Sequence, residues 1–332
     1  MKKLMALLLT LSLALVAMSA TAESASGLKL GLYVNTTASS SKDAGDADGL
    51  AQVNTTAVAV LVDAEGKIVD VDIDSVQTAM PFTATGTLGA EFPADAATKR
   101  ELGDNYGMSK VSQIGEWDAQ IAALCAYLVG KTADEVKNVA MDETTKPTDE
   151  ELTAGCTMSI GGFISTVVSA MEAATDCDAK ATDKVGLSIV TNTSHSKDAA
   201  DGKDGQCQAY SFFAAVTAGE DGVITACKID STQGTVTFDA TGKITSDLTA
   251  RTATKQELGD RYGMRAASGI GKEWFEQADA FAAYVIGKTA ADVEGIALDE
   301  STKPTDAELA ASVTVSAGSL QSAVLKALSC AK

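Results

Sequence analysis

The chain carries the same succession of motifs twice, and this duplication limits the folds that it can adopt. Glu101-Leu-Gly-Asp-Asn-Tyr-Gly-Met108 recurs as Glu257-Leu-Gly-Asp-Arg-Tyr-Gly-Met264, and Lys146-Pro-Thr-Asp149 recurs as Lys303-Pro-Thr-Asp306. The period is far longer than the roughly 20–50 residues of a solenoid repeat. It matches the size of a domain with its own core. A feature present in both copies is therefore a candidate for a shared structural or functional role.

An export signal precedes the first copy. Lys2 and Lys3 are followed by an apolar run over 4–18 and by the small-residue site Ala20-Thr21-Ala22. The run is short for a membrane span, which needs about 20 residues. We expect cleavage after Ala22 and a secreted or cell-surface protein, with a retained signal anchor as the alternative. The predicted organisation is a signal peptide (1–22), repeat unit one (23–172), a linker (173–183) and repeat unit two (184–332).

The charge of the chain excludes some classes of partner. The formal net charge of −19 becomes −21 when the signal is removed, because Lys2 and Lys3 leave with it. Such a surface repels nucleic acid, whose binding depends on Lys and Arg at phosphates. No second apolar stretch reaches spanning length, so we expect no membrane span in the mature chain. The oligomeric state stays open.

The cysteines do not form a framework common to both copies. None of the six, at positions 125, 156, 177, 207, 227 and 330, falls on a cysteine of the other copy, and no CxxC pair is present. We expect mostly small buried residues, although export permits incidental disulfides.

The first part of each unit has the pattern of an antiparallel sheet. Apolar stretches over 28–34 and 185–190 open the units. Two hairpins follow, with alternating β-branched residues around the turns Asp63-Ala-Glu-Gly66 and Gly219-Glu-Asp-Gly222. We expect further short strands at 76–82 and 87–92, and at 233–238 and 243–248. Asp70, Asp72 and Asp74 predict a solvent-facing strand edge.

The second part of each unit has helical spacing. Trp117, Ile121, Leu124 and Leu128 form one apolar stripe, repeated at positions 274, 278, 281 and 285. Gly130 and Gly287 are typical helix stops. Capping boxes are predicted at Thr132 with Glu135, Thr148 with Glu151, and Thr305 with Glu308. A last helix carries Phe163, Val167 and Met171. The fold class is therefore α+β: two tandem homologous domains, each a small antiparallel sheet followed by several helices.

A Thr-x-Ser-x-Gly element stands before the last helix of each unit. It is Thr157-Met-Ser159-Ile-Gly161 in the first copy and Thr314-Val-Ser316-Ala-Gly318 in the second. A Ser or Thr at such a position can cap the free N–H groups of a helix. The same N–H groups also suit a phosphate. The sequence leaves a plain N-cap and a phosphate or flavin site as alternatives.

These residues resemble the exported FMN-binding domain family. Val62-Asp-Ala-Glu-Gly-Lys-Ile68 with Val71-Asp-Ile73 is similar to the hairpin of that family, and Thr153-Ala-Gly-Cys-Thr-Met-Ser159 is similar to its Asp-x-x-Ser-Gly-Ala-Thr motif. The resemblance implies FMN held covalently, through a phosphoester to Thr157 and Thr314, by a separate flavin transferase. The family motif differs here at Ala154-Gly155-Cys156 and at Ala311-Ser312-Val313. The unit also resembles duplicated exported proteins of gut Clostridia.

Other repeated features allow both a structural and a ligand-binding interpretation. Tyr106 and Tyr262, in the Leu-Gly-Asp-x-Tyr-Gly-Met block, can stack on a flat ligand or fill a core. Trp117 and Trp274 are expected in the core. The acidic segment from Asp43 to Gly49 lacks EF-hand spacing and predicts a solvated loop.

Hydrolytic catalysis finds little support. The chain has one histidine, His195, which falls on Ser40 of the other copy, and no nucleophile elbow or P-loop. We therefore predict no catalytic or metal-binding residues and no enzymatic activity as the main role.

The functional hypothesis is a tandem-repeat flavin-binding protein, an extracellular electron carrier that meets a membrane redox partner. Its cofactor residues are Thr157, Ser159, Thr314, Ser316, Tyr106 and Tyr262. The alternative is a cofactor-free surface or solute-binding repeat protein.

Overall fold

The structure is a computed structural model that describes residues 27–332. The predicted signal peptide lies outside the described residues. None of the helices in the described part is both long and apolar enough to cross a membrane. We refer to residues 27–172 as the first half and to residues 184–332 as the second half.

Two antiparallel four-stranded sheets form the centre of the molecule. The first has the order β3-β2-β1-β5 and the second has the order β4-β6-β7-β8. Their long strands are β1 (Lys29–Thr37), β2 (Gly49–Val62), β3 (Ile68–Phe82), β6 (Lys184–Asn192), β7 (Gly205–Ala218) and β8 (Ile224–Phe238). β4 (Asp95–Ala96) and β5 (Thr175–Asp176) are short. Each sheet has the same register, because Lys29 pairs with Val62 in one half and Lys184 pairs with Ala218 in the other.

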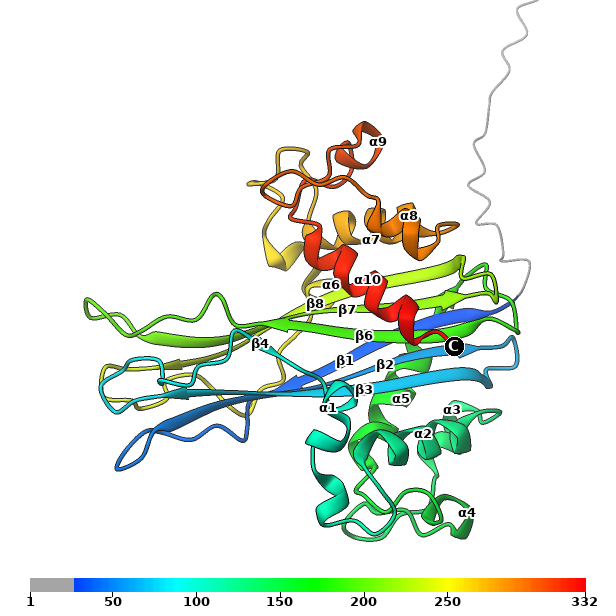
Figure 1. Ribbon diagram of the computed structural model, residues 1–332, viewed down its shortest axis with the longest axis horizontal. Coiled ribbons are helices and arrows are strands. Elements are labelled where there is room, and N and C mark those ends of the chain that lie inside the picture. Colours follow the sequence, from blue (N-terminus) through cyan, green and yellow to red (C-terminus); the bar gives the residue numbers. More distant parts are fainter. Residues whose placement is uncertain (1–26) are drawn as a thin grey trace, which may run out of the picture.

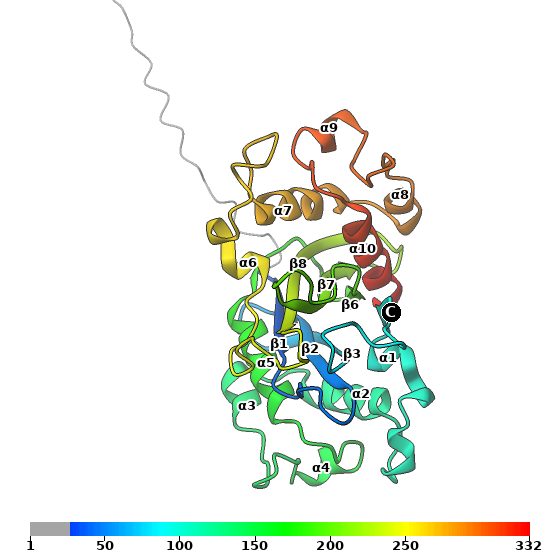
Figure 2. The same cartoon turned by 90° about the vertical axis from the view of Figure 1, so that its left-hand side faces the viewer.

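The two sheets pack face to face, and helices cover their outer faces (Figure 1). The inner core includes Leu30, Leu61, Leu187 and Phe213, all fully buried. On the outer face of the first sheet lie α1 (Lys99–Leu102), α2 (Trp117–Leu128), α3 (Ala133–Lys137), α4 (Glu150–Thr153) and α5 (Gly161–Glu172). The second sheet carries α6 (Lys255–Leu258), α7 (Trp274–Val285), α8 (Ala290–Glu294), α9 (Ala307–Ala310) and α10 (Gly318–Cys330). Figure 2 shows the resulting order of helices, sheet, sheet and helices.

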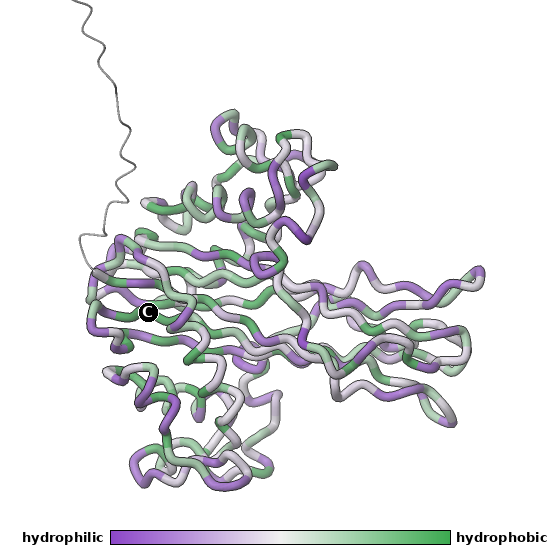
Figure 3. The backbone as a smooth tube through the Cα atoms, turned by 180° about the vertical axis from the view of Figure 1, so that it is seen from behind, coloured by the Kyte–Doolittle hydropathy of each residue, from purple (hydrophilic) through white to green (hydrophobic). Residues whose placement is uncertain are grey.

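The strands continue beyond the helices as an arm made of β-structure alone (Figure 1, left, and Figure 3, right). A separate apolar cluster fills the arm, and Phe82 stacks on Phe238 with ring centroids 4.4 Å apart. This contact joins equivalent residues of the two halves, so the arm needs both sheets for its core.

Each half gives strand-like segments to the other. Asp95 and Ala96 of the first half pair with Asn192 and Thr191, and the Thr252 N–H donates to the carbonyl of Thr36 at 2.9 Å. The predicted linker also takes part, because its strand β5 pairs with β1. The division into two domains stays a prediction.

The predicted acidic loop also joins the halves. The Asp43 carboxylate accepts from the Ile244 N–H at 2.8 Å, and the Asp198 carboxylate accepts from the Leu88 N–H at 2.7 Å. These reciprocal contacts give the loop a structural role at the arm.

The α+β class, the hairpins, the Trp helices and the last helices are as predicted. Gly130 and Gly287 end helices with φ values of 81° and 80°, and the Thr132–Glu135 capping box is present. The strand predictions at 76–82 and 233–238 are wrong as separate strands, because these residues continue β3 and β8. Residues 87–92 and 243–248 form no strand, and contribute only isolated bridges at Leu88 and Ile244.

Two predicted capping boxes are wrong. Asp149 and Asp306 are the N-cap residues of α4 and α9, one residue after Thr148 and Thr305. Each Asp side chain accepts hydrogen bonds from two backbone N–H groups of the first turn. Asp is at least as good an N-cap as Thr, and here its side chain satisfies both donors.

Candidate functional site

The Thr-x-Ser-x-Gly elements lie immediately before α5 and α10, as predicted. Their serines do not cap these helices: the N-cap residues are Ile160 and Ala317, with no side-chain cap. The Ser159 hydroxyl instead donates to the carbonyl of Thr144 at 2.8 Å, and the Ser316 hydroxyl donates to that of Ser301 at 3.0 Å. The serines therefore fasten the segment before the helix to a neighbouring turn.

That turn contains an unusual backbone conformation in both halves. Thr145 and Thr302 have φ values of 62° and 58°, a region that residues with a Cβ rarely adopt. Their carbonyls accept from Ile160 N–H and Ala317 N–H at 2.8 and 2.7 Å. The cost of such a conformation is of the order of 1–3 kcal/mol. The turn thus holds the helix start in one position.

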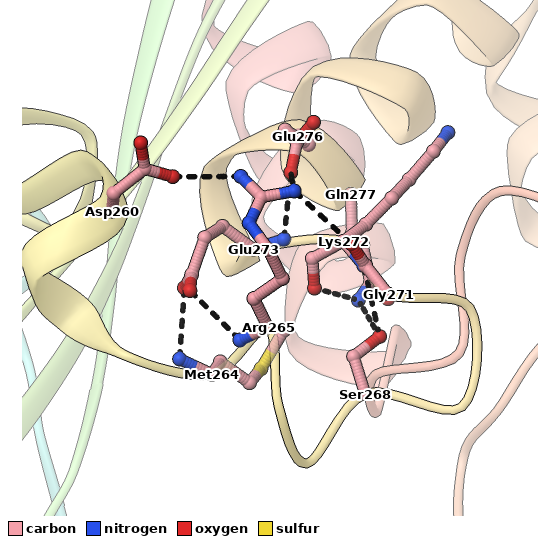
Figure 4. A network of polar contacts seen from close by, with 9 residues as sticks. All are labelled: Asp260, Met264, Arg265, Ser268, Gly271, Lys272, Glu273, Glu276 and Gln277. Carbon is pink, nitrogen blue, oxygen red and sulfur yellow. Dashed lines mark hydrogen bonds and ion pairs between the residues drawn. The ribbon is translucent and has the colours of Figure 1, made fainter.

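A buried glutamine holds each motif threonine. The Gln277 side-chain oxygen accepts from the N–H groups of Thr314 and Val315, at 2.8 and 3.1 Å, and lies 3.3 Å from the Thr314 hydroxyl. Its amide nitrogen donates to the Ser268 hydroxyl and to the Lys272 carbonyl, both at 3.2 Å (Figure 4). Gln120 makes the corresponding contacts with Thr157. A buried amide whose oxygen and nitrogen both form hydrogen bonds fixes the orientation of the segment that it binds.

A buried glutamate orders the loop on the other side of this glutamine. The Glu273 carboxylate accepts from Met264 N–H and Arg265 N–H at 2.9 and 2.7 Å (Figure 4). Glu116 does the same for Met108 and Ser109 in the first half. In the second half, the Arg265 side chain also contacts Asp260 and Glu276. The Leu-Gly-Asp-x-Tyr-Gly-Met block is therefore tied to the Thr-x-Ser-x-Gly element through one helix.

The sequence contained a signal for these residues that motif reading missed. Glu116-Trp-Asp-Ala-Gln120 recurs as Glu273-Trp-Phe-Glu-Gln277, so Glu-Trp-x-x-Gln stands at the start of both Trp helices. Buried Glu and Gln side chains are expensive unless they are fully hydrogen-bonded. Their presence in both copies thus pointed to an ordered polar network.

Thr314 lines a pocket of about 460 Å³. The wall also contains Met264, Ser268, Gln277 and the exposed Lys303. Thr314 is half-buried, whereas its counterpart Thr157 is exposed. The pocket therefore distinguishes the second half, although the family motif is better preserved in the first half, at Gly155-Cys156.

The two motif tyrosines lie against lysines. Lys255 Nζ is 4.5 Å from the ring centroids of both Tyr262 and Tyr210, and 5.0 Å from that of Trp274. In the first half, Lys99 Nζ lies 4.7 Å from the Tyr106 ring, and the Tyr106 hydroxyl donates to Gln77. Trp117 and Trp274 are buried, as predicted. These contacts bring each tyrosine together with a core tryptophan and a lysine.

The cysteines act as small residues. None of the six, all within residues 27–332, forms a disulfide. Burial raises the pKa of the Cys207 and Cys227 thiols to about 12. Across the same residues, no group of three or more His, Cys, Asp or Glu side chains is arranged to hold a metal ion.

Comparisons with known proteins give one short match. The chain is 51% identical over 41 residues to a protein described as chlorophenol reductase from Desulfitobacterium hafniense. The match covers 12% of this chain and 12% of that protein. No protein-family model matches the chain, and no solved structure matches it.

Proposed function

We propose that the chain is an exported flavin-binding protein that carries electrons outside the membrane. FMN would be held at the Thr-x-Ser-x-Gly elements, with Thr314 as the first attachment residue. The observation that carries this proposal is the position of Thr314, which lines a pocket whose wall also contains Lys303. The resemblance of the hairpin and of the motif to the FMN-binding domain family supports the same function.

The residues around Thr314 fit a flavin phosphate. α10 begins at Gly318, four residues after Thr314, and none of its residues lines the pocket. Its first turn has no side-chain cap, and its N–H groups and positive dipole end favour an anion near the pocket. Lys303 adds a positive charge to the pocket wall, which also contains Asp299. The Asp299 carboxylate accepts from the N–H groups of Ser301 and Lys303. The Gln277 oxygen holds the Thr314 segment in place through the N–H groups of Thr314 and Val315. The Thr314 hydroxyl would give up its own contact with this oxygen on attachment, because its proton leaves. The aromatic ring system would pack on the apolar part of the wall, which includes Met264 and Val315.

Attachment would be a phosphoester made by a flavin transferase. The Thr314 oxygen would bond to the flavin phosphate of a dinucleotide donor, and the other half of the donor would leave as a nucleoside monophosphate that carries the hydroxyl proton. A flavin held there supplies one- and two-electron transfer. The protein would contribute the attachment residue and the orientation of the flavin.

The test is the intact mass of protein co-expressed with a flavin transferase. We expect one FMN adduct that maps to Thr314, and a second at Thr157 if the exposed site is also used. Thr314→Val should abolish the first adduct because the hydroxyl is the attachment atom, and Thr314→Ser should retain part of it. Thr157→Val is the matched control and should leave the Thr314 adduct intact.

Two results together would overturn the flavin proposal. They are an unmodified mass in the native host and the absence of reversible flavin binding by the purified protein. The alternative function, a cofactor-free surface or solute-binding protein, would then be preferred. A separate pocket of about 720 Å³ favours that second candidate.

A further inference from the structure

The pocket of about 720 Å³ lies between the two halves. Its walls come from the edge of β1, from the segment around β5, and from β8, α6 and α7 of the second half. Its apolar lining residues include Leu32, Ile229 and Ala282. None of its lining residues belongs to the pocket beside Thr314. It is therefore a separate site.

In the equivalent place on the other side of the molecule, the protein's own side chains occupy the strand edge. Asp70 and Asp72 of β3 accept from the N–H groups of Val185 and Leu187 of β6, both at 3.0 Å. Arg100 forms an ion pair with the same Asp72 carboxylate. The Asp72 carboxylate therefore satisfies a backbone N–H at the edge of β6 and at the same time pairs with a cation.

The corresponding edge in the pocket lacks that carboxylate. By register, Leu32 of β1 is equivalent to Leu187, while Ala226 and Lys228 of β8 are equivalent to Asp70 and Asp72. β5 pairs only with Lys29 and Leu30, so it stops short of Leu32. Further along the edge, the carbonyl of Val34 accepts from Arg251. The outward N–H of Leu32 therefore faces the pocket between these two covered positions.

Lys228 supplies a positive charge at the same place. Its side chain lines the pocket, and no carboxylate of the described residues lies within ion-pair distance of it. Burial lowers the pKa of Lys228, and the nearby Asp279 carboxylate acts in the opposite direction. A partly buried ammonium in an apolar pocket is stabilised by a bound anion.

The acidic side chains in the pocket wall have other partners or face solvent. Asp279 accepts from the Gln256 amide at 2.8 Å, and Glu257 pairs with Arg251. Asp230 accepts from Ser231 N–H and Gln256 N–H, and burial raises its pKa to about 6. Asp176 and Asp178 are exposed, and Asp176 lies 4.0 Å from Lys29 Nζ. Their charges weaken anion binding at a distance without occupying Lys228.

We propose that this pocket binds an organic carboxylate with an apolar body, whose carboxylate bridges the Leu32 N–H and the Lys228 ammonium. The ligand carboxylate would take the role that the Asp72 carboxylate has in the other half, and Lys228 would supply the positive charge that Arg100 supplies there. The proposal rests on the second candidate function, solute binding, and is independent of flavin attachment at Thr314.

The test is calorimetric titration of the full mature protein with phenylbutyrate and with hexanoate, using neutral phenylbutanol as the matched compound. We expect saturable binding of at least one carboxylate and binding of phenylbutanol weaker by about tenfold or more, as for loss of one charged hydrogen bond. Lys228→Gln should weaken carboxylate binding to a similar extent. Lys243→Gln, at an exposed position in the arm, is the control and should bind normally.

A second variant rebuilds the closed arrangement of the first half. Lys228→Asp combined with Gln256→Arg restores the Asp72–Arg100 pair at the equivalent positions, and we expect it to abolish carboxylate binding. The proposal is overturned if neither carboxylate binds, or if either variant binds as tightly as the unaltered protein. If phenylbutanol binds and the two carboxylates do not, the solute-binding function is retained, but recognition through a carboxylate group is refuted. The FMN adduct at Thr314 is unaffected by each of these outcomes.

Discussion

Lys255 is a buried cation held among three aromatic rings. Its side chain is 2% exposed, and its ammonium donates to the Tyr210 hydroxyl at 2.5 Å. The ring faces of Tyr210, Tyr262 and Trp274 favour the charged form. Burial opposes it and lowers the pKa of Lys255 to about 7, against the attraction of Asp230. Folding therefore changes the titration of this residue.

This shift predicts the pH dependence of stability. Between about pH 7 and pH 10, Lys255 is protonated in the unfolded chain, where its pKa is about 10.4, but increasingly neutral in the folded protein. The unfolded state binds more protons, so stability should rise with pH through this window. In Lys255→Met this rise in melting temperature should be reduced. Lys243→Met serves as the control, and an equal slope in all three proteins would contradict the assignment.

At this scale the sequence was informative about residue types but not about their partners. The core position of Trp117 and Trp274 followed from helical spacing, because burial of a stripe is a local property. Asp72 and Asp74 were predicted to face solvent, and this is wrong: Asp74 is 2% exposed and Asp72 pairs with Arg100. The partner that makes burial of Asp72 tolerable lies 28 residues away in sequence. Spacing alone could not reveal it.

Among the elements, α5 and α10 approach the sheets most closely at a glycine of β1 and of β6. A Cβ at Gly31 would lie 2.0 Å from the Ala170 carbonyl oxygen, and one at Gly186 would lie 2.0 Å from that of Ala327. Both contacts involve backbone, which cannot move aside as a flexible side chain can. The last helix of each half therefore depends on glycine in the strand beneath it.

Gly186→Ala should accordingly destabilise the protein. The added methyl group must push α10 away from β6, and we expect a loss of about 1–3 kcal/mol in the free energy of unfolding, as for other overpacked cores. Chemical denaturation measures this loss. Gly45→Ala, whose Cβ would meet nothing within 4 Å, should be nearly neutral. Equal stability of the two variants would mean that the helix packs less tightly than described.

The elements themselves were mostly predictable. Hairpin turns and helix stops are encoded by a few adjacent residues, so Asp63–Gly66 and Gly130 were identified correctly. The strands were predicted too short, because Asp74 and Ser75 interrupt the apolar pattern in the middle of β3. These polar residues are accommodated by bonds to each other and to Arg100 N–H. Such compensation depends on tertiary structure.

For the whole molecule, the main feature is the apolar contact between the two sheets. Fourteen buried residues of the described chain fill it, among them Leu30, Leu61, Val76, Leu187, Ile189, Phe213 and Ala215. β4 of the first half pairs with β6, and Thr252 of the second half pairs with Thr36 of β1. Sequence patterns cannot predict these two pairings, because segments of one or two residues show no periodicity. The Thr314 pocket was likewise unpredictable, since it requires loops from three helical segments to meet.

The second half alone should test this contact. Residues 184–332 expressed without the first half would expose Leu187, Ile189 and Phe213 to water. We expect them to fold cooperatively and to form a dimer of two second halves, because a symmetric pair buries the same face twice. Sedimentation combined with thermal melting measures both properties. A stable monomer would show that the second half does not need the contact between the sheets. A molten second half would instead show that the two halves form one inseparable domain.

The covalent linkage of the halves has a further consequence for the strand edges beside Asp72 and Lys228. In an assembly of two identical chains every amino-acid replacement appears at both symmetry-related positions, so a sealed edge and a vacant one cannot coexist. Joining the two units in one polypeptide removes that restriction. One edge can then contribute to stability while the other binds a ligand. A single mutation can change one of the two edges and leave the equivalent edge unaltered.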